Sequence, residues 1–233
     1  MDPHPRPVTV PARRPATVLL VCTGNVCRSP AAERVLAARL AGTGVRVVSA
    51  GTRAVVGAPA SAPMAPLVEA AGGTLDGFVA RQLTAELVDG ADLVLTMTRE
   101  HRSAVSVLSP AAVRRTATLR EAAHLLRAAG RVPGGWVVDR VRAVPDTLAS
   151  TRGRVPPLDA DPAAWWRRGS AARRGAVHAD DVVDPIGGSD ALYRRSFGQI
   201  LPALDALAAV LLARPVGDRP GGRARTGPAG PPG

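Results

Sequence analysis

Near the start of the chain, a loop of small residues joins an apolar strand directly to a helix. Residues 17–21 (TVLLV) are β-branched or aliphatic and predict a buried strand, whereas residues 29–40 predict a helix. In the loop between them, 22–28 (CTGNVCR), successive backbone N–H groups can turn toward one centre. A strand that passes directly into a helix is typical of α/β proteins.

The same alternation continues along the chain. It predicts further strands at 45–49, 92–97 and 115–119. It also predicts helices at 62–71, 99–108, 120–129 and 192–213, the last kinked or divided by Pro202. We therefore expect an α/β three-layer sandwich with a four-stranded parallel sheet and flavodoxin-like winding. Ligands of such sheets bind at the carboxyl ends of the strands, where the loop 22–28 lies.

The loop has the chemistry of an oxyanion site. Its amide groups can form an anion nest that the following helix N-terminus reinforces, and Arg28 adds a planar fork that can bind two oxygens. The positive potential inside such a ring favours the thiolate form of Cys22, which makes this residue a candidate nucleophile. The candidate ligand-binding residues beside them are Thr23, Gly24, Asn25, Val26, Cys27 and Ser29.

The segment VCTGNVCRSPAAE resembles the phosphate-binding loop of the low-molecular-weight protein tyrosine phosphatases. Further similar segments follow in the same order: 49–52 (SAGT), 80–83 (ARQL), 91–97 (ADLVLTM) and the pair Asp184-Pro185. From its residues alone, the Arg-Gln pair of 80–83 is interpreted as a solvated helix start. The resemblance covers roughly residues 17–126 and 179–212, and it implies a phosphatase I-like fold.

The resemblance and the chemistry of the side chains together imply a two-step reaction. Cys22 attacks phosphorus and forms a phosphocysteine, while Arg28 and the loop amides hold the phosphate oxygens. Asp184 protonates the leaving oxygen and then activates water. Asp180 and Asp181 are neighbouring carboxylates, and the match to the Asp-Pro pair favours Asp184 over them.

Supporting residues follow from the same resemblance. Ser29 would donate a hydrogen bond to the sulfur of Cys22, and Asn25, in a left-handed turn, would bond to Ser49. A family position that is usually histidine in this network is Phe78 here, which predicts a looser network. Cys27 has two interpretations: a core thiol, or a partner of Cys22 in a reversible disulfide.

Composition limits the compartment and the partners. Two cysteines in one loop are not a secreted disulfide framework, and apolar runs of membrane length are missing, so we expect a cytoplasmic protein that binds no membrane. The net charge is +11, but the excess arginine lies in 1–16, 127–178 and 214–233, which argues against a nucleic-acid partner. No metal or other cofactor is expected.

These segments also define the expected domain organisation. Residues 1–16 are predicted to be a flexible arm, 17–213 the phosphatase domain, and 214–233 a disordered tail rich in Gly, Pro and Arg. Within the domain, an irregular insertion at about 130–178, which carries Trp165-Trp166, is expected to be a largely disordered loop.

The expected substrate is phosphotyrosine on proteins, with a tyrosine kinase or its targets as partners and the chain as a monomer or weak dimer. Arginine phosphatases of the family tend to have threonine where this chain has Val26, which favours tyrosine. Against this, Ile186 and Gly187 stand where aromatic residues often wall the substrate ring. The alternatives are a protein arginine phosphatase, an arsenate reductase that uses a low-molecular-weight thiol, and an oxyanion-binding regulatory module.

Overall fold

The computed structural model describes residues 13–158 and 178–213 of the chain. Its centre is a parallel sheet of four strands, β1 (Ala16–Cys22), β2 (Val45–Gly51), β3 (Leu93–Thr96) and β4 (Thr116–Thr118). The strands lie in the order β2-β1-β3-β4, so the strand order reverses beside β1. The predicted sheet and its winding are confirmed. The predicted tail, 214–233, and residues 1–12 of the predicted arm lie outside the described residues. The inner end of the arm, 13–16, is held against the domain, so the expected flexibility is wrong there: Ala16 is buried in β1, and Arg14 donates to Asp92 at 2.8 Å.

Seven α-helices accompany the sheet in the described residues. They are α1 (Arg28–Arg39), α2 (Ala65–Ala70), α3 (Ala85–Asp89), α4 (Arg99–Leu108), α5 (Leu119–Ala129), α6 (Val137–Arg152) and α7 (Asp190–Leu212). Short 3₁₀ turns cover Ala62–Met64 and Pro110–Arg115. The sequence did not predict α3, because five residues are too few to show a helical period.

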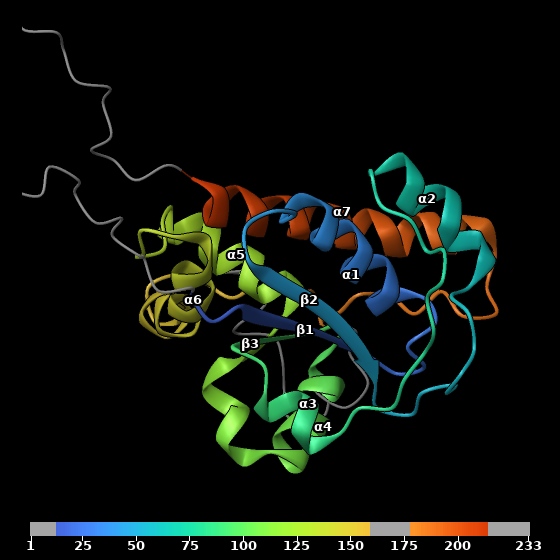
Figure 1. Cartoon of the computed structure of the whole chain (residues 1–233), viewed down its shortest axis with the longest axis horizontal. Helices are drawn as coiled ribbons and strands as arrows, with labels where there is room; N and C mark the ends of the chain where they lie inside the picture. Colours follow the sequence, from blue (N-terminus) through green and yellow to red (C-terminus); the bar gives the residue numbers. More distant parts are fainter. Residues whose placement is uncertain (1–12, 159–177, 214–233) are drawn as a thin grey trace, which may run out of the picture.

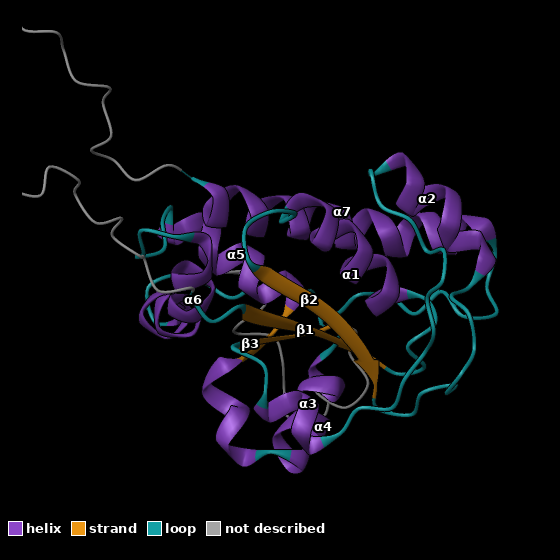
Figure 2. Ribbon diagram, viewed as in Figure 1, coloured by secondary structure: helices purple, strands orange, loops and turns teal. Residues whose placement is uncertain are grey.

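Both faces of the sheet are covered, which makes three layers (Figures 1 and 2). Successive side chains of β1 point to opposite faces. Val18 and Leu20 pack in one core with α1, α5, α6 and α7, whereas Leu19 and Val21 pack in a second core with α3 and α4. β1 is therefore buried on both sides, and its carboxyl end is held rigidly.

Helix α7 runs unbroken through Pro202, so the predicted division into two helices is wrong. A proline in a helix removes one backbone hydrogen bond, but α7 packs along α1 and α5 on both sides of it, and this burial offsets the loss. In the described part of the chain, α7 is the one helix whose length and composition would suit a membrane span. Ten of its residues are buried, as in the core helix of a globular domain.

The first part of the insertion is also ordered, so the expectation of a largely disordered loop is wrong there. Residues 137–152 form α6, which packs against α5 and the sheet. The guanidinium of Arg140 is buried and donates to the carbonyls of Gly134, at 2.9 Å, of Leu211, at 2.8 Å, and of Ala213. It therefore satisfies the terminal carbonyls of α7. Residues 159–177, with Trp165-Trp166, lie outside the described residues.

Candidate active site

The loop 22–28 lies at the carboxyl end of β1, and its carbonyl groups are turned away from its centre. Four of them accept hydrogen bonds from the segment after β2, at N···O distances of 2.7–3.0 Å. The donor and acceptor pairs are Thr52 to Cys22, Arg53 to Thr23, Val55 to Gly24, and Ser61 to Val26. Within the described residues, the amides of 23–27 donate to no protein atom, so they are available to an anion.

Asn25 shapes this loop, as predicted. It has φ of 54°, the left-handed conformation that Asn tolerates better than most residues. Its Nδ2 donates to the hydroxyls of Ser29, at 3.0 Å, and Ser49, at 2.8 Å. Its Oδ1 accepts from the backbone N–H of Arg81 at 2.9 Å. Both the nitrogen and the oxygen of the Asn25 side-chain amide therefore hold the turn.

The network around Asn25 is closed, so the predicted looseness is wrong. Ser49 donates to Glu33 at 2.5 Å, and Arg81 Nε donates to the Ser49 carbonyl at 2.7 Å. Burial raises the pKa of Glu33 above its usual value, and this effect is larger than the lowering by the hydrogen bond from Ser49. Phe78 is buried under the Arg34 guanidinium, 5.7 Å from the ring centre, and takes no part. Glu33 was not predicted from the sequence.

The interpretation of 80–83 as a helix start is also wrong. Gln82 pairs with Gly51 in an isolated parallel bridge, which extends the edge of the sheet beyond β2. The backbone there comes very close to the loop: a Cβ on Gly51 would lie 2.9 Å from the Asn25 nitrogen and closer still to the Thr23 carbonyl. Only glycine fits at this point.

Cys22 and Ser29 are in contact, as predicted. Their sulfur and hydroxyl oxygen are 2.9 Å apart, and both residues are buried. Because Asn25 already donates to the Ser29 oxygen, the Ser29 proton is free to point at the sulfur. The Ser29 hydroxyl is therefore placed to donate to the sulfur when the sulfur is a nucleophile or a leaving group.

Arg28 closes the loop from the first turn of α1. It is 3% exposed, and it donates to the Val182 carbonyl at 3.2 Å, to the Thr23 hydroxyl at 3.3 Å and to the carboxylate of Asp184. Its Nε is buried and has no hydrogen-bond partner in the described residues. A buried guanidinium N–H without a partner is costly, and an anion in the loop would satisfy it.

His101, on α4, also supports the loop and was missed from the sequence. Its Nε2 lies 2.9 Å from the Thr23 hydroxyl and its Nδ1 lies 2.8 Å from the Thr98 hydroxyl. Burial first, and then the charges of Arg28 and Arg53, lower the pKa of His101 from 6.5 to about 3. Since Thr23 accepts from Arg28, it donates to Nε2 of a neutral ring. In the sequence, His101 is visible only as a histidine three residues after the helix-capping Thr98. This pattern does not reveal the contact with Thr23.

Of the three candidate acids, the structure brings Asp184 to the loop. Its carboxylate contacts Arg28, and its side chain is 42% exposed. Asp180 is 4% exposed and accepts two hydrogen bonds from Arg99 Nε, at 2.8 and 2.9 Å. Asp181 accepts from the Arg99 backbone N–H at 2.8 Å. Asp180 and Asp181 thus anchor the acid loop to α4.

Cys27 is a buried free thiol here, the first of its two interpretations. Its sulfur lies 3.9 Å from the hydroxyl of Tyr193, which is itself 2.9 Å from the Ser61 hydroxyl. Burial raises the pKa of Cys27 above the usual thiol value. The disulfide with Cys22 stays a prediction. Tyr193, on α7, is a second supporting residue that the sequence did not indicate.

Two exposed aliphatic residues are hydrogen-bonded through their backbones to the loop and to the candidate acid. Val55, whose backbone N–H donates to Gly24, is 55% exposed, and Ile186, whose N–H donates to the carboxylate of Asp184 at 3.2 Å, is 58% exposed. Among the described residues, no group of three or more His, Cys, Asp or Glu side chains is placed to hold a metal ion.

A parallel α/β sandwich with a C-X5-R loop at the carboxyl edge of its sheet defines the phosphatase I-like class of proteins. Residues 17–133 match the family described as low molecular weight phosphotyrosine protein phosphatase, and the chain belongs to this family. The resemblance stated from the sequence is thereby confirmed.

Similar proteins include the low molecular weight protein-tyrosine-phosphatase Etp of Escherichia coli (strain K12), 45% identical over 94 residues, which are 40% of this chain and 62% of Etp. Wzb of Salmonella typhi is 41% identical over 93 residues, 40% of this chain and 61% of Wzb. The chain thus spans less than two thirds of the length of these relatives.

Solved structures match a larger share of the chain than these sequences do. The tyrosine phosphatase AmsI of Erwinia amylovora has a TM-score of 0.56 at 22% identity, covering 83% of this chain and 92% of AmsI. The arginine phosphatase YwlE of Geobacillus stearothermophilus has a TM-score of 0.55 at 26% identity, covering 83% and 91%.

Proposed function

We propose that the chain is a cysteine-dependent phosphatase that hydrolyses phosphotyrosine on proteins. The observation that carries this proposal is the buried Arg28 guanidinium, whose Nε has no partner among the described residues, beside Cys22 and a ring of unused amides. These unused donors lie in one short loop beside the thiol, and the non-bridging oxygens of a phosphate can accept from them.

In the first step, the Cys22 thiolate attacks phosphorus, an S–P bond forms, and the P–O bond to the substrate breaks. The loop amides and Arg28 hold the three non-bridging oxygens. The leaving oxygen takes a proton from the protonated Asp184 carboxyl group. A bound phosphate also competes for the Arg28 donor that Asp184 now occupies, which releases the carboxyl group toward the leaving oxygen.

In the second step, Asp184 is a carboxylate and takes a proton from water as the water oxygen attacks phosphorus. The S–P bond breaks, and the sulfur leaves as a thiolate that the Ser29 hydroxyl stabilises. Inorganic phosphate is the product. Neutral His101 orients Thr23 so that a lone pair of its hydroxyl faces Arg28. Both steps therefore use the side chains and loop amides of this chain together with one water molecule.

Phosphotyrosine as the substrate is supported by the names of the relatives and by Val26 in the loop. One second candidate has support of its own: hydrolysis of phosphoarginine on proteins. The structure of an arginine phosphatase, YwlE, is similar at 26% identity, and Ile186 leaves the mouth of the loop without an aromatic wall at that position. We further propose a cytoplasmic location, with a kinase or its targets as partners.

The proposal is tested with p-nitrophenyl phosphate, a phosphotyrosine peptide, a phosphoarginine peptide and arsenate in one panel. We expect hydrolysis of the first two, abolished in Cys22→Ser, with phosphate binding retained in that variant. Turnover that persists in Cys22→Ser would overturn the phosphocysteine mechanism. Faster hydrolysis of phosphoarginine than of phosphotyrosine would replace the first candidate by the second.

A further inference from the structure

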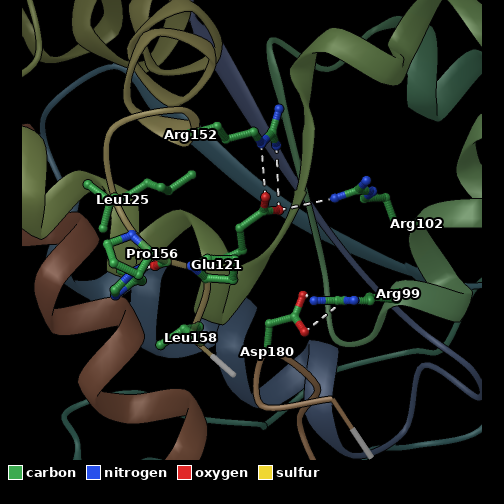
Figure 3. A pocket seen from close by; sticks show the side chains of 11 residues that line it. Arg99, Arg102, Glu121, Leu125, Arg152, Pro156, Leu158 and Asp180 are labelled. Atoms are coloured by element: carbon green, nitrogen blue, oxygen red, sulfur yellow. Dashed lines mark hydrogen bonds and ion pairs between the residues drawn. The ribbon is translucent and has the colours of Figure 1, made fainter. Parts of the chain in front are cut away.

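A cavity of about 340 Å³ lies between α4, α5 and the turn that follows α6 (Figure 3). None of its lining residues belongs to the phosphate loop or takes part in the proposed reaction. It shares Asp180 with the base of the loop that carries Asp184. Its volume is at the lower end of the range for small-molecule sites, which indicates a small ligand rather than a protein partner.

One side of the cavity is polar and carries excess positive charge. Glu121 accepts hydrogen bonds from two arginines, Arg102 at 3.2 Å and Arg152 at 2.9 Å (Figure 3). These two side chains are 43% and 36% exposed. One carboxylate neutralises only one of the two charges. Each guanidinium has five N–H donors, and Glu121 uses few of them, so donors remain for a second anion.

The opposite side is apolar. Leu125 comes from α5, and Val155, Pro156 and Leu158 come from the turn after α6. His124 Nε2 donates to the Pro156 carbonyl at 2.9 Å and holds this turn against α5. In Figure 3, Leu125, Pro156 and Leu158 lie across the cavity from Arg102. An apolar wall beside two cations fits a molecule with an apolar body and one anionic group.

We propose that this cavity is an effector site for a small organic anion. The anionic group binds Arg102 and Arg152, and the apolar body packs on Leu125, Pro156 and Leu158.

The cavity is connected to the active site through the first turn of α4. Arg99 and Arg102 line the cavity from the first turn of α4, and His101 of the same turn contacts Thr23 in the phosphate loop. The backbone N–H of Arg99 also holds Asp181, three residues before Asp184. A ligand that moves this turn therefore changes the support of both the loop and the acid.

The binding test uses 8-anilinonaphthalene-1-sulfonate with the full chain, followed by its fluorescence. N-phenyl-1-naphthylamine has the same apolar body without the sulfonate and is the matched control ligand. We expect saturable binding of the sulfonate, about tenfold weaker in each of Arg102→Gln and Arg152→Gln, since each loses a charged hydrogen bond. Leu158→Asp tests the apolar wall and should weaken binding as well. Far-UV circular dichroism verifies that each variant is folded.

Arg114→Gln is the matched control variant, because it removes the same charge from a side chain that is 85% exposed and outside the cavity. Equal binding of the sulfonate by all variants, or equal binding of both ligands, would overturn the proposal. So would loss of binding in Arg28→Gln alone, which would place the probe in the phosphate loop. The proposal would also be overturned if the sulfonate bound only after residues 159–177 were replaced by a Gly-Ser linker, because that segment of the chain would then be the occupant of the cavity.

The effector role is tested by turnover of p-nitrophenyl phosphate at saturating probe. We expect kcat to change at least twofold in the parent chain and in Arg114→Gln. In Arg102→Gln, a higher concentration of probe should be required for the same change in kcat. An unchanged kcat at saturation would overturn the effector role. This part rests on the proposed phosphatase activity, whereas the binding test needs no turnover, so the two proposals fail separately.

Discussion

Arg28 and Asp184 are in direct contact although 156 positions separate them in the chain. The cation is almost completely buried, and the carboxylate is 42% exposed. Arg28 is held by α1 and by the Thr23 hydroxyl, so it is the rigid member of the pair. Asp184 is the member that can move, and a phosphate that competes for Arg28 would direct it toward the leaving oxygen.

Asp184→Asn is expected to slow hydrolysis by roughly 100-fold or more for poor leaving groups, because it removes the proton that the leaving oxygen needs. Activated esters such as p-nitrophenyl phosphate need this proton less and should lose less activity. A series of aryl phosphates with graded leaving groups measures this difference as a steeper dependence of kcat on leaving-group pKa.

The matched variant is Asp181→Asn, which removes a neighbouring carboxylate that bonds the Arg99 backbone. It should leave the slope of the leaving-group series unchanged. A steeper slope in Asp181→Asn than in Asp184→Asn would transfer the acid role to Asp181.

The loop could be predicted from the sequence because its chemistry is local. Cys22, Arg28 and Ser29 lie within eight consecutive residues, and a strand followed by a helix brings them to one centre. The contacts of Glu33 and His101 depend on where α1 and α4 pack, and neither side chain has a signal of its own in the sequence.

Helix α6 shows a second limit of sequence patterns. Arg140 and Pro145 interrupt its apolar period, so residues 137–152 resemble an irregular segment. In the fold, Arg140 is buried because the last carbonyls of α7 accept its hydrogen bonds. Those acceptors are about seventy residues away, and their availability is a property of the tertiary structure.

His101 is expected to make the fold sensitive to acid. Its pKa is about 3 in the folded protein, below the ordinary 6.5, so the unfolded chain binds the proton first as pH falls. The folded state therefore loses stability between pH 6.5 and 3. Relative to pH 7, the loss from this residue at pH 4 is about 3 kcal/mol.

His101→Gln carries no titrating ring and isolates this effect. We expect urea unfolding to show a smaller loss of stability from pH 7 to pH 4 in His101→Gln than in the parent chain. Equal losses in the two proteins would contradict the assignment of a neutral, buried ring.

The two cysteines are expected to differ in reactivity. Burial raises the pKa of Cys27, so at neutral pH it is a thiol, which is a poor nucleophile. Cys22 lies at the centre of the amide ring, which also attracts an anionic reagent. Iodoacetate at pH 7 should therefore alkylate Cys22 alone, and inorganic phosphate should protect it, as peptide mass spectrometry can determine. Modification of Cys27 first, or no protection by phosphate, would contradict this prediction.

Gly51 tests how closely the end of β2 must approach the loop. A methyl group in Gly51→Ala would meet backbone atoms of Thr23 and Asn25, which cannot yield without moving the loop. We expect a loss of about 1–3 kcal/mol in the free energy of unfolding, as for overpacking in a core. Phosphate affinity and kcat should fall with it, since Asn25 would no longer hold its turn.

Gly135→Ala is the matched control, because its added Cβ meets nothing within 4 Å. Chemical unfolding and phosphate inhibition measured on both variants make the comparison. If Gly51→Ala retained the phosphate affinity and stability of Gly135→Ala, the loop would not depend on this close approach, and the amide ring would have to be held by its hydrogen bonds to residues 52–61 alone.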